Sequence, residues 1–309
     1  MKIVFLDAAT LGKANLEKIE RLGDFIKYET TKKEETIERL KDADIAITNK
    51  VLITKDVIEK TNLKLICVAA TGVNNIDLEA AKIKNIPVKN VAGYSTNSVV
   101  TQTYATLLAL LTNINFYNEY SQSPFGWVKS EIFTNVDRPI LELANKKFGV
   151  IGLGNIGLVV AKIAKAFDCE VCYYSTSGKN HNKDFKSVSL DELLTTCDIV
   201  SVHCALNEKT KNLIAKDEIK KLKNGAVIMN FGRGGIINEN DLANAIDTQN
   251  LKVGLDVLSR EPIEKNSPFL SVKNKQNLII TPHTAWTSVE AREKLVDIIA
   301  NNIQEFLNN

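Results

Sequence analysis

Residues 147–167, KFGVIGLGNIGLVVAKIAKAF, constrain the fold of this chain more than any other stretch. The short, β-branched run Phe148–Ile151 predicts a buried strand, and the apolar residues at helical spacing in 158–167 predict a helix. The hexapeptide 152–157, GLGNIG, therefore lies where a strand turns directly into a helix. Free N–H groups at a helix N-terminus of this kind bind phosphate groups.

The three glycines of this turn have the spacing G-x-G-x-x-G, which is typical of dinucleotide sites. In such a site the first glycine allows the tight turn, the second lets the backbone approach a pyrophosphate, and the third lets the helix pack on the strand. An ordinary glycine-rich βα turn is the alternative, but the flanking strand and helix favour the cofactor interpretation. The expected cofactor contacts here are Gly152, Gly154, Asn155, Ile156 and Gly157.

The composition is that of an ordinary globular chain with two domains. The 309 residues are 44% hydrophobic and 25% charged, which is enough for two cores of usual size. With a net charge of +2 and no basic patch interleaved with aromatics, no nucleic-acid partner is expected. No apolar run approaches membrane-spanning length and Met1 leads into a predicted strand, so no membrane partner or signal peptide is expected.

The five cysteines are scattered in apolar segments, which predicts a reducing, cytoplasmic location. Cys169 and Cys172 have C-x-x-C spacing. Residues three apart on a strand face opposite ways, so buried thiols are expected there rather than a redox or metal pair.

The first third of the chain alternates predicted strands and helices, as a parallel α/β domain does. The strands are expected at Lys2–Leu6, Asp44–Thr48, Leu65–Ala69 and Val88–Val91, and the helices at Leu16–Leu22, Lys33–Lys41 and Asp77–Ile83. A nucleotide fingerprint usually opens its own domain, so a complete smaller domain is expected before it.

The turn that contains Thr71, Gly72 and Val73 follows the third of these strands. Its N–H groups suit a substrate carboxylate, because ligands bind at the carboxyl ends of parallel strands. A simple βα turn explains the same residues equally well.

A long apolar helix is expected at Ser98–Leu111, followed by an irregular aromatic segment, 113–145, that contains two prolines. So many aromatic side chains need a surface to cover them. A contact between two copies of the chain, as in a homodimer, and packing against another part of the same chain are both compatible with this composition.

After the glycine turn the alternation resumes, which predicts a doubly wound sheet. Strands are expected at Glu170–Tyr174, Ile199–His203, Ala226–Phe231, Val253–Asp256 and Leu278–Thr281, and helices at Leu190–Thr195, Lys216–Leu222 and Glu239–Ile246. Residues at these strand ends lie along the edge where a cofactor must bind. The further candidate cofactor contacts are Ser175, His203, Phe231, Asp256 and Ala285.

The end of the second strand bears on the choice between NAD and NADP. NAD sites usually carry an acidic residue about twenty residues after the glycine turn, but Ser175 stands at that position. Nothing there repels a 2′-phosphate, and Lys179 is available to bind one, although no arginine is. NAD is the expected cofactor, with NADP not excluded.

Three polar residues complete a possible active site. Arg233 follows a buried strand among glycines and is suited to a carboxylate, although a solvated loop arginine is the commoner case. Glu261 alone would be an ordinary loop acid, but His283 follows Pro282 at the end of the last strand and offers an acid or base near neutral pH. His181 is expected to be solvated, and a core role is favoured for His203.

The sequence resembles the D-isomer-specific 2-hydroxyacid dehydrogenases over essentially its whole length. The resemblance rests on GLGNIG at 152–157, NFGRGG at 230–235, GLDVLSREP at 254–262 and TPHTAW at 281–286. Within that family, residues 69–77, residues 90–95 and Trp286 are most similar to the glycerate dehydrogenase, or hydroxypyruvate reductase, branch.

The resemblance implies a Rossmann dinucleotide-binding domain, residues 98–287, inserted into a flavodoxin-like substrate domain, residues 1–97 and 288–309. It implies that the helical segment Val289–Leu307 packs on the first domain and that the active site lies between the domains. No metal is implied.

Site roles also follow from the resemblance. Arg233 matches the arginine that holds the α-carboxylate and carbonyl oxygen, Glu261 the acid paired with the catalytic histidine, and His283 the proton donor. Thr71, Gly72 and Val73 match the carboxylate-binding turn. Asp256 matches a residue near the nicotinamide carboxamide.

The expected function is NAD(P)-dependent reduction of hydroxypyruvate to D-glycerate, or of glyoxylate to glycolate. Two alternatives remain: a D-lactate-type dehydrogenase that acts on another short 2-keto acid, and a dinucleotide-sensing binding protein of the same fold. Substrate size is expected to depend on side chains from several loops, with Lys50 and Trp286 as candidates.

Overall fold

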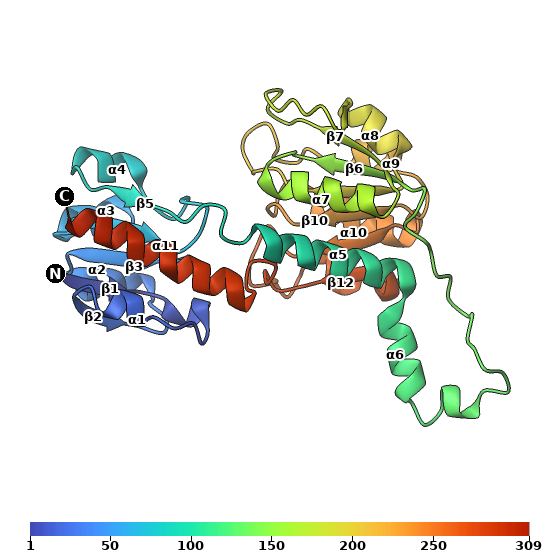
Figure 1. The fold of residues 1–309 in the computed structure, drawn as a ribbon, viewed down its shortest axis with the longest axis horizontal. Helices are drawn as coiled ribbons and strands as arrows, with labels where there is room; N and C mark the ends of the chain where they lie inside the picture. Colours follow the sequence, from blue (N-terminus) through green and yellow to red (C-terminus); the bar gives the residue numbers. More distant parts are fainter. Residues whose placement is uncertain (309) are drawn as a thin grey trace. The chain divides into compact units, whose positions relative to one another are not determined.

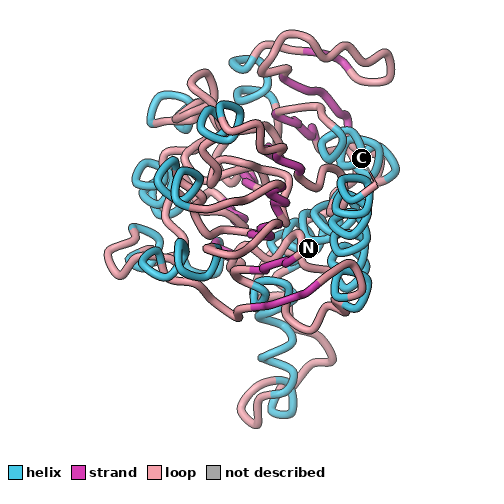
Figure 2. The backbone as a smooth tube through the Cα atoms, turned by 90° about the vertical axis from the view of Figure 1, so that its left-hand side faces the viewer, coloured by secondary structure: helices cyan, strands magenta, loops and turns pink. Residues whose placement is uncertain are grey.

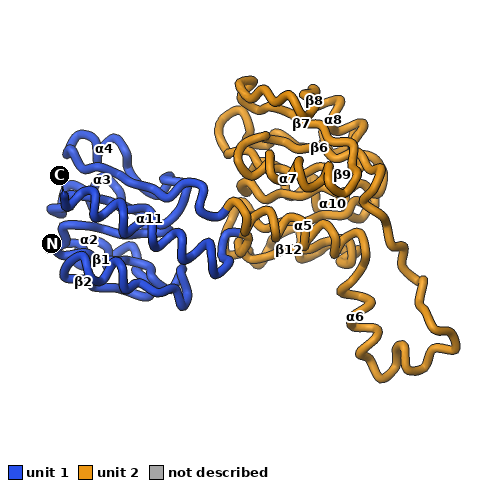
Figure 3. Tube along the Cα trace, in the orientation of Figure 1, with its two compact units in different colours: residues 1–95, 286–309 blue, residues 96–285 orange. Residues whose placement is uncertain are grey.

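The computed structural model describes residues 1–308, which divide into two compact units (Figure 3). Unit 1 is built from Met1–Ser95 together with the chain from Trp286 onward, and unit 2 is Thr96–Ala285. The predicted domain ranges are offset from these boundaries by two residues at each junction. Each unit contains one parallel sheet covered by helices, so the predicted α/β class is confirmed (Figure 1).

The sheet of unit 1 has the strand order β2-β1-β3-β4-β5, which is the flavodoxin-like order. Its strands are β1 (Lys2–Phe5), β2 (Asp24–Lys27), β3 (Ile45–Thr48), β4 (Leu65–Val68) and β5 (Val88–Lys89). The sequence did not predict β2, because this edge strand is only partly buried and lacks an apolar run.

Short helices connect these strands. They are η1 (Ala8–Leu11), α1 (Glu17–Glu20), η2 (Lys33–Glu35), α2 (Thr36–Leu40), α3 (Lys55–Lys60) and α4 (Leu78–Ile83). The C-terminal helix α11 (Val289–Leu307) packs against α1 and β4, and its Leu295 and Ile299 join the same buried cluster as Phe5 (Figure 1). The last helix of the chain therefore completes the core of the first unit.

Unit 2 contains a seven-stranded sheet in the order β12-β11-β10-β9-β6-β7-β8. Its strands are β6 (Lys147–Ile151), β7 (Glu170–Tyr174), β8 (Lys186–Ser187), β9 (Ile199–Val202), β10 (Val227–Asn230), β11 (Lys252–Leu255) and β12 (Leu278–Ile280). Every paired strand is parallel, and the direction of winding reverses at β6, directly before the glycine turn. A reversal of this kind is where doubly wound sheets bind dinucleotides.

Buried clusters on both faces of this sheet join it to its helices. The helices of unit 2 are α5 (Thr96–Thr112), α6 (Ile114–Gln122), η3 (Trp127–Lys129), α7 (Asn155–Ala166), α8 (Leu190–Thr196), α9 (Lys216–Lys221), α10 (Glu239–Thr248), η4 (Pro268–Ser271) and η5 (Lys275–Asn277). No helix within residues 1–308 is long and apolar enough to cross a membrane.

Residues 113–140, here called the arm, extend away from the sheet of unit 2 (Figures 1 and 2). The prediction of an irregular segment is wrong for α6, because Asn113 adopts a left-handed conformation (φ 53°) that ends α5 and lets a new helix begin. The apolar side chains of the arm are largely exposed, with Phe125 at 78% and Phe133 at 88%.

Candidate active site

The glycine turn after β6 allows backbone contacts that no other residue permits. Gly152 has a φ of +92°, and a Cβ there would lie 2.7 Å from backbone atoms of Cys204. A Cβ at Gly157 would lie 2.2 Å from the carbonyl oxygen of Gly152. A Cβ at Gly154, by contrast, would meet no described atom within 4 Å. The turn is thus packed on one side and open beside Gly154, at the N-terminus of α7, where a pyrophosphate fits.

Two buried polar atoms that lack hydrogen-bond partners among the described residues flank this turn. Ser175 Oγ follows β7 and His203 Nδ1 follows β9, the two strands on either side of β6. Leaving such a group unsatisfied costs about 1–3 kcal/mol, so both are suited to a bound polar ligand. A dinucleotide, which carries ribose hydroxyls and amide groups, fits this arrangement.

The remaining contacts of His203 are inside the protein. Its Nε2 lies 2.8 Å from Ser201 Oγ, and its ring stacks on Phe231 with a 20° angle between the planes. Burial lowers the pKa of His203 to about 3, so the ring is neutral at physiological pH. The sequence favours a buried histidine whose ring bonds within the core. Among the described residues, however, Nε2 has a hydrogen-bond partner and Nδ1 has none.

A second group of polar residues lies beyond the adjacent strands β10, β11 and β12. Asn230 holds the loop of Arg233: its Nδ2 donates to the Arg233 carbonyl at 2.8 Å, and its Oδ1 accepts from the Gly232 N–H at 3.0 Å. A Cβ at Gly234 would lie 2.1 Å from the Leu258 carbonyl group, so this loop packs directly on the next one. The exposed Arg233 side chain keeps most of its donors available, because only its Nη1 bonds to Gly232.

His283 and Glu261 form the central pair of this group. His283 Nδ1 lies 2.7 Å from Glu261 Oε2, and the other carboxylate oxygen accepts from the Leu258 N–H at 3.0 Å. The side chains are 24% and 34% exposed, so the pair is only partly screened by solvent. With Nδ1 committed to Glu261, Nε2 is the nitrogen that can exchange a proton with a ligand.

Asp256 holds the turn that carries His283. Its buried carboxylate accepts from the Thr281 hydroxyl at 2.6 Å and from the N–H groups of Thr284 and Ala285 at 2.9 and 3.0 Å. Its carbonyl oxygen accepts from the His283 N–H, which stabilises the left-handed backbone of His283 (φ 54°). The sequence predicts Asp256 as a cofactor contact, and it does not reveal that Asp256 holds the turn of His283 or that Asn230 holds the loop of Arg233. The position of each polar residue at the end of a buried strand was the only sequence feature that pointed to these roles.

The substrate turn expected at Thr71, Gly72 and Val73 lies in unit 1. Thr71 Oγ1 donates to the Val91 carbonyl at 3.0 Å, so its hydroxyl proton is used inside this unit. In the neighbouring loop the buried carboxylate of Asp7 accepts from three successive N–H groups, those of residues 49–51. Burial is the main cause that raises the pKa of Asp7, although these bonds oppose it.

Residues 104–285 match the model of the D-isomer specific 2-hydroxyacid dehydrogenase NAD binding domain. The chain belongs to the D-isomer-specific 2-hydroxyacid dehydrogenase family. A hydroxypyruvate reductase from Blautia hydrogenotrophica is 39% identical over 99% of this chain and 97% of that protein. A glycerate dehydrogenase from Methylorubrum extorquens is 35% identical over 99% of this chain and 96% of that protein.

The solved structure of an acyclic imino acid reductase in complex with NADPH and D-Arg is similar to this chain, with a TM-score of 0.87 and 32% sequence identity. The match covers 100% of this chain and 97% of the reductase chain. The predicted family and fold are therefore confirmed, and this family member is an oxidoreductase with an NAD-binding domain.

We expect His203 to make folding sensitive to acid. The unfolded chain protonates this histidine near pH 6.5 whereas the folded chain resists protonation down to about pH 3, so stability is lost as the pH falls between these values. At pH 5 the loss relative to pH 8 is about 1–2 kcal/mol. The measurement is the free energy of unfolding by denaturant at pH 8 and at pH 5, for the wild type and for His203→Gln. Its decrease from pH 8 to pH 5 should be smaller in His203→Gln than in the wild type by about 1–2 kcal/mol.

The exposed His181 provides the matched control, because His181→Gln should leave the pH dependence unchanged. An equal pH dependence in wild type and His203→Gln would show that His203 titrates normally in the folded state.

Proposed function

We propose that this family member reduces hydroxypyruvate to D-glycerate, and glyoxylate to glycolate, with NADH. The observation that carries the proposal is the 2.7 Å contact between His283 and Glu261, one loop away from Arg233 on the ends of adjacent strands. The similarity to a hydroxypyruvate reductase and a glycerate dehydrogenase supports the choice of substrate.

In this proposal the bound nicotinamide supplies the hydride that reduces the C2 carbonyl. The Arg233 guanidinium holds the substrate carboxylate and stabilises negative charge as it develops on the carbonyl oxygen. His283 donates the proton from Nε2 to that oxygen, and the hydrogen bond between Nδ1 and Glu261 holds the ring in place for the transfer. Asn230 and Asp256 keep the two loops in place through their backbone hydrogen bonds.

Ser175 supports NADH over NADPH in this proposal. Its buried hydroxyl has no hydrogen-bond partner among residues 1–308, so it can bond a ribose hydroxyl directly. Asn180 Nδ2 donates to the Leu153 carbonyl at 3.1 Å, which ties the following loop to the glycine turn. The exposed Lys179 is the residue that would bind a 2′-phosphate.

The test is the loss of absorbance of NADH, and separately of NADPH, with hydroxypyruvate, glyoxylate and pyruvate at matched concentrations. We expect the fastest oxidation with NADH and hydroxypyruvate, and a turnover about 10²–10⁴-fold lower in His283→Ala, because that variant lacks the proton donor. Faster reduction of pyruvate would instead indicate a D-lactate-type enzyme. Dinucleotide binding without turnover of any keto acid would indicate a sensing protein.

Glu261→Gln should weaken reduction. The substitution keeps the size of the side chain but replaces the carboxylate that bonds to His283 with a neutral amide. The lost charged hydrogen bond predicts a decrease in kcat/KM of about tenfold or more. Glu264→Gln, a change at an exposed acid in the same loop, is the control and should leave kcat/KM unaltered. An unchanged kcat/KM in Glu261→Gln would remove Glu261 from this role.

We also propose that the arm mediates a homodimer. Its exposed apolar side chains, which include Phe125, Val128 and Phe133 at 76–88% exposure, need a surface to cover them. Light scattering should give a dimeric mass for the wild type and a shift toward monomer for Phe133→Ser. Ile83→Ser removes an equally exposed apolar residue from unit 1 and should leave the dimer intact. A monomeric wild type would contradict the proposal.

Cytoplasmic location is the last part of the proposal. All five cysteines are free thiols, which suits a reducing compartment. Fractionation of the source cells should recover the protein with cytoplasmic markers, and its recovery with exported proteins would contradict this location.

A further inference from the structure

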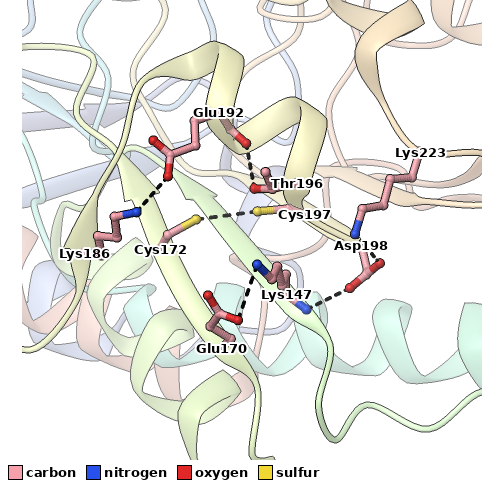
Figure 4. Close-up of polar contacts among 9 residues, drawn as sticks. All are labelled: Lys147, Glu170, Cys172, Lys186, Glu192, Thr196, Cys197, Asp198 and Lys223. Carbon is pink, nitrogen blue, oxygen red and sulfur yellow. Dashed lines mark hydrogen bonds and ion pairs between the residues drawn. The ribbon is translucent and has the colours of Figure 1, made fainter.

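Two cysteines that are distant in the sequence meet in unit 2. Cys172 lies in β7 and Cys197 directly follows α8, and their Sγ atoms are 3.5 Å apart (Figure 4). Both sulfurs lie over the same face of the sheet, because Cys172 pairs across the strands with Gly149 and a Cβ at Gly149 would lie 2.9 Å from the Cys197 sulfur. The missing side chain of Gly149 thus provides the room in which the Cys197 sulfur lies.

The other cysteines differ in their surroundings. Cys169 Sγ donates to the Leu143 carbonyl at 3.2 Å, so the C-x-x-C spacing of the sequence does not bring Cys169 to Cys172. Within residues 1–308 no group of three or more His, Cys, Asp or Glu side chains could hold a metal ion. Two thiols alone do not make a closed metal site, which needs four ligands. Oxidation is the chemistry left to this pair.

Exposure and charge differ between the two sulfurs. Cys197 is buried, whereas Cys172 is partly exposed and gives the pair a route to solvent. The hydrogen bond shared with Cys172 lowers the pKa of Cys197; burial opposes this shift, and the nearby Lys223 ammonium adds to it. The surrounding ion pairs, Lys147–Glu170, Lys186–Glu192 and Lys223–Asp198, connect the strands and helices around the sulfurs (Figure 4).

We propose that Cys172 and Cys197 are a modification site, a dithiol that hydroperoxides oxidise to an intramolecular disulfide. The partly exposed Cys172 sulfur attacks a peroxide oxygen as its thiolate and breaks the O–O bond, which gives a sulfenic acid at Cys172 and hydroxide. The buried Cys197 sulfur then attacks the sulfenic sulfur and expels its hydroxyl group as water. Overall, two thiols and hydrogen peroxide give one disulfide and two waters, and the two electrons pass from sulfur to peroxide.

The movement required is small. The sulfurs must approach from 3.5 Å to the disulfide bond length of about 2.05 Å. Rotation of the partly exposed Cys172 side chain and a slight shift at the end of α8 can supply this. Cys197 is the C-cap of α8, so the shift involves only the last bond of the helix, from the Cys197 N–H to the Leu193 carbonyl at 3.0 Å.

The experiment maps the disulfide in the full chain. Tryptic peptides 166–179 and 187–209 each carry two cysteines, so the background is the double variant Cys169→Ser/Cys204→Ser, in which each peptide keeps one. The protein is treated with hydrogen peroxide, its free thiols are alkylated, and it is digested without reductant. Mass spectrometry should find the two peptides joined, with a mass two hydrogens below the summed masses of the two thiol peptides. Treatment with dithiothreitol should separate them again.

Further variants in the wild-type background identify the two sulfurs. Cys172→Ser and Cys197→Ser should each abolish the link, and in Cys197→Ser a sulfenic acid at Cys172 should be trapped by dimedone. Alkylation of both cysteines after peroxide treatment, oxidation of each without a link, or a link through Cys169 or Cys204 in the wild type would overturn the proposal. If a serine variant fails to fold, the peptide map of the double variant still decides. No step depends on turnover, so the result stands apart from that of the keto-acid assay.

Discussion

Close approach of backbone to backbone at a few glycines is the constraint on which this site depends. Any side chain at Gly152, Gly157 or Gly234 would collide with backbone atoms at 2.7 Å or less. The first two glycines let α7 follow β6 after a turn of only three residues, 152–154, and the third brings the loop of Arg233 onto that of Glu261. Gly154, between the first two, is open: a Cβ there would meet no described atom within 4 Å.

Some polar residues around these turns form hydrogen bonds within the protein, and others have a buried polar atom without a hydrogen-bond partner among the described residues. Asn230 and Asp256 bond to backbone N–H and carbonyl groups and hold the loops that carry Arg233 and His283. Ser175 Oγ and His203 Nδ1 are buried without a partner among the described residues. Because an unsatisfied buried group costs free energy, this division separates structural polar residues from those suited to a ligand.

The same sheet brings together chemistry of a different kind at β7. Cys172 and Cys197 meet by packing over Gly149 rather than through sequence spacing, so a glycine of β6, the strand that leads into the cofactor turn, makes room for the contact. Cys172 lies in β7, and Ser175, an expected cofactor contact, directly follows the end of this strand. The cysteine pair is therefore three residues along the chain from the edge of the sheet where the cofactor is expected to bind.

The α/β class and the central place of residues 147–167 follow from the sequence alone, because periodicity and glycine spacing are local properties. Residue chemistry and position favoured His283, whereas Arg233 and Glu261 became candidates through the family resemblance. The tertiary structure alone decided that Glu261 lies 2.7 Å from His283, that Cys172 meets Cys197 instead of Cys169, and that β2 joins the sheet edge. These contacts join segments that are distant in the chain. They depend on strand order and register, which no local pattern specifies.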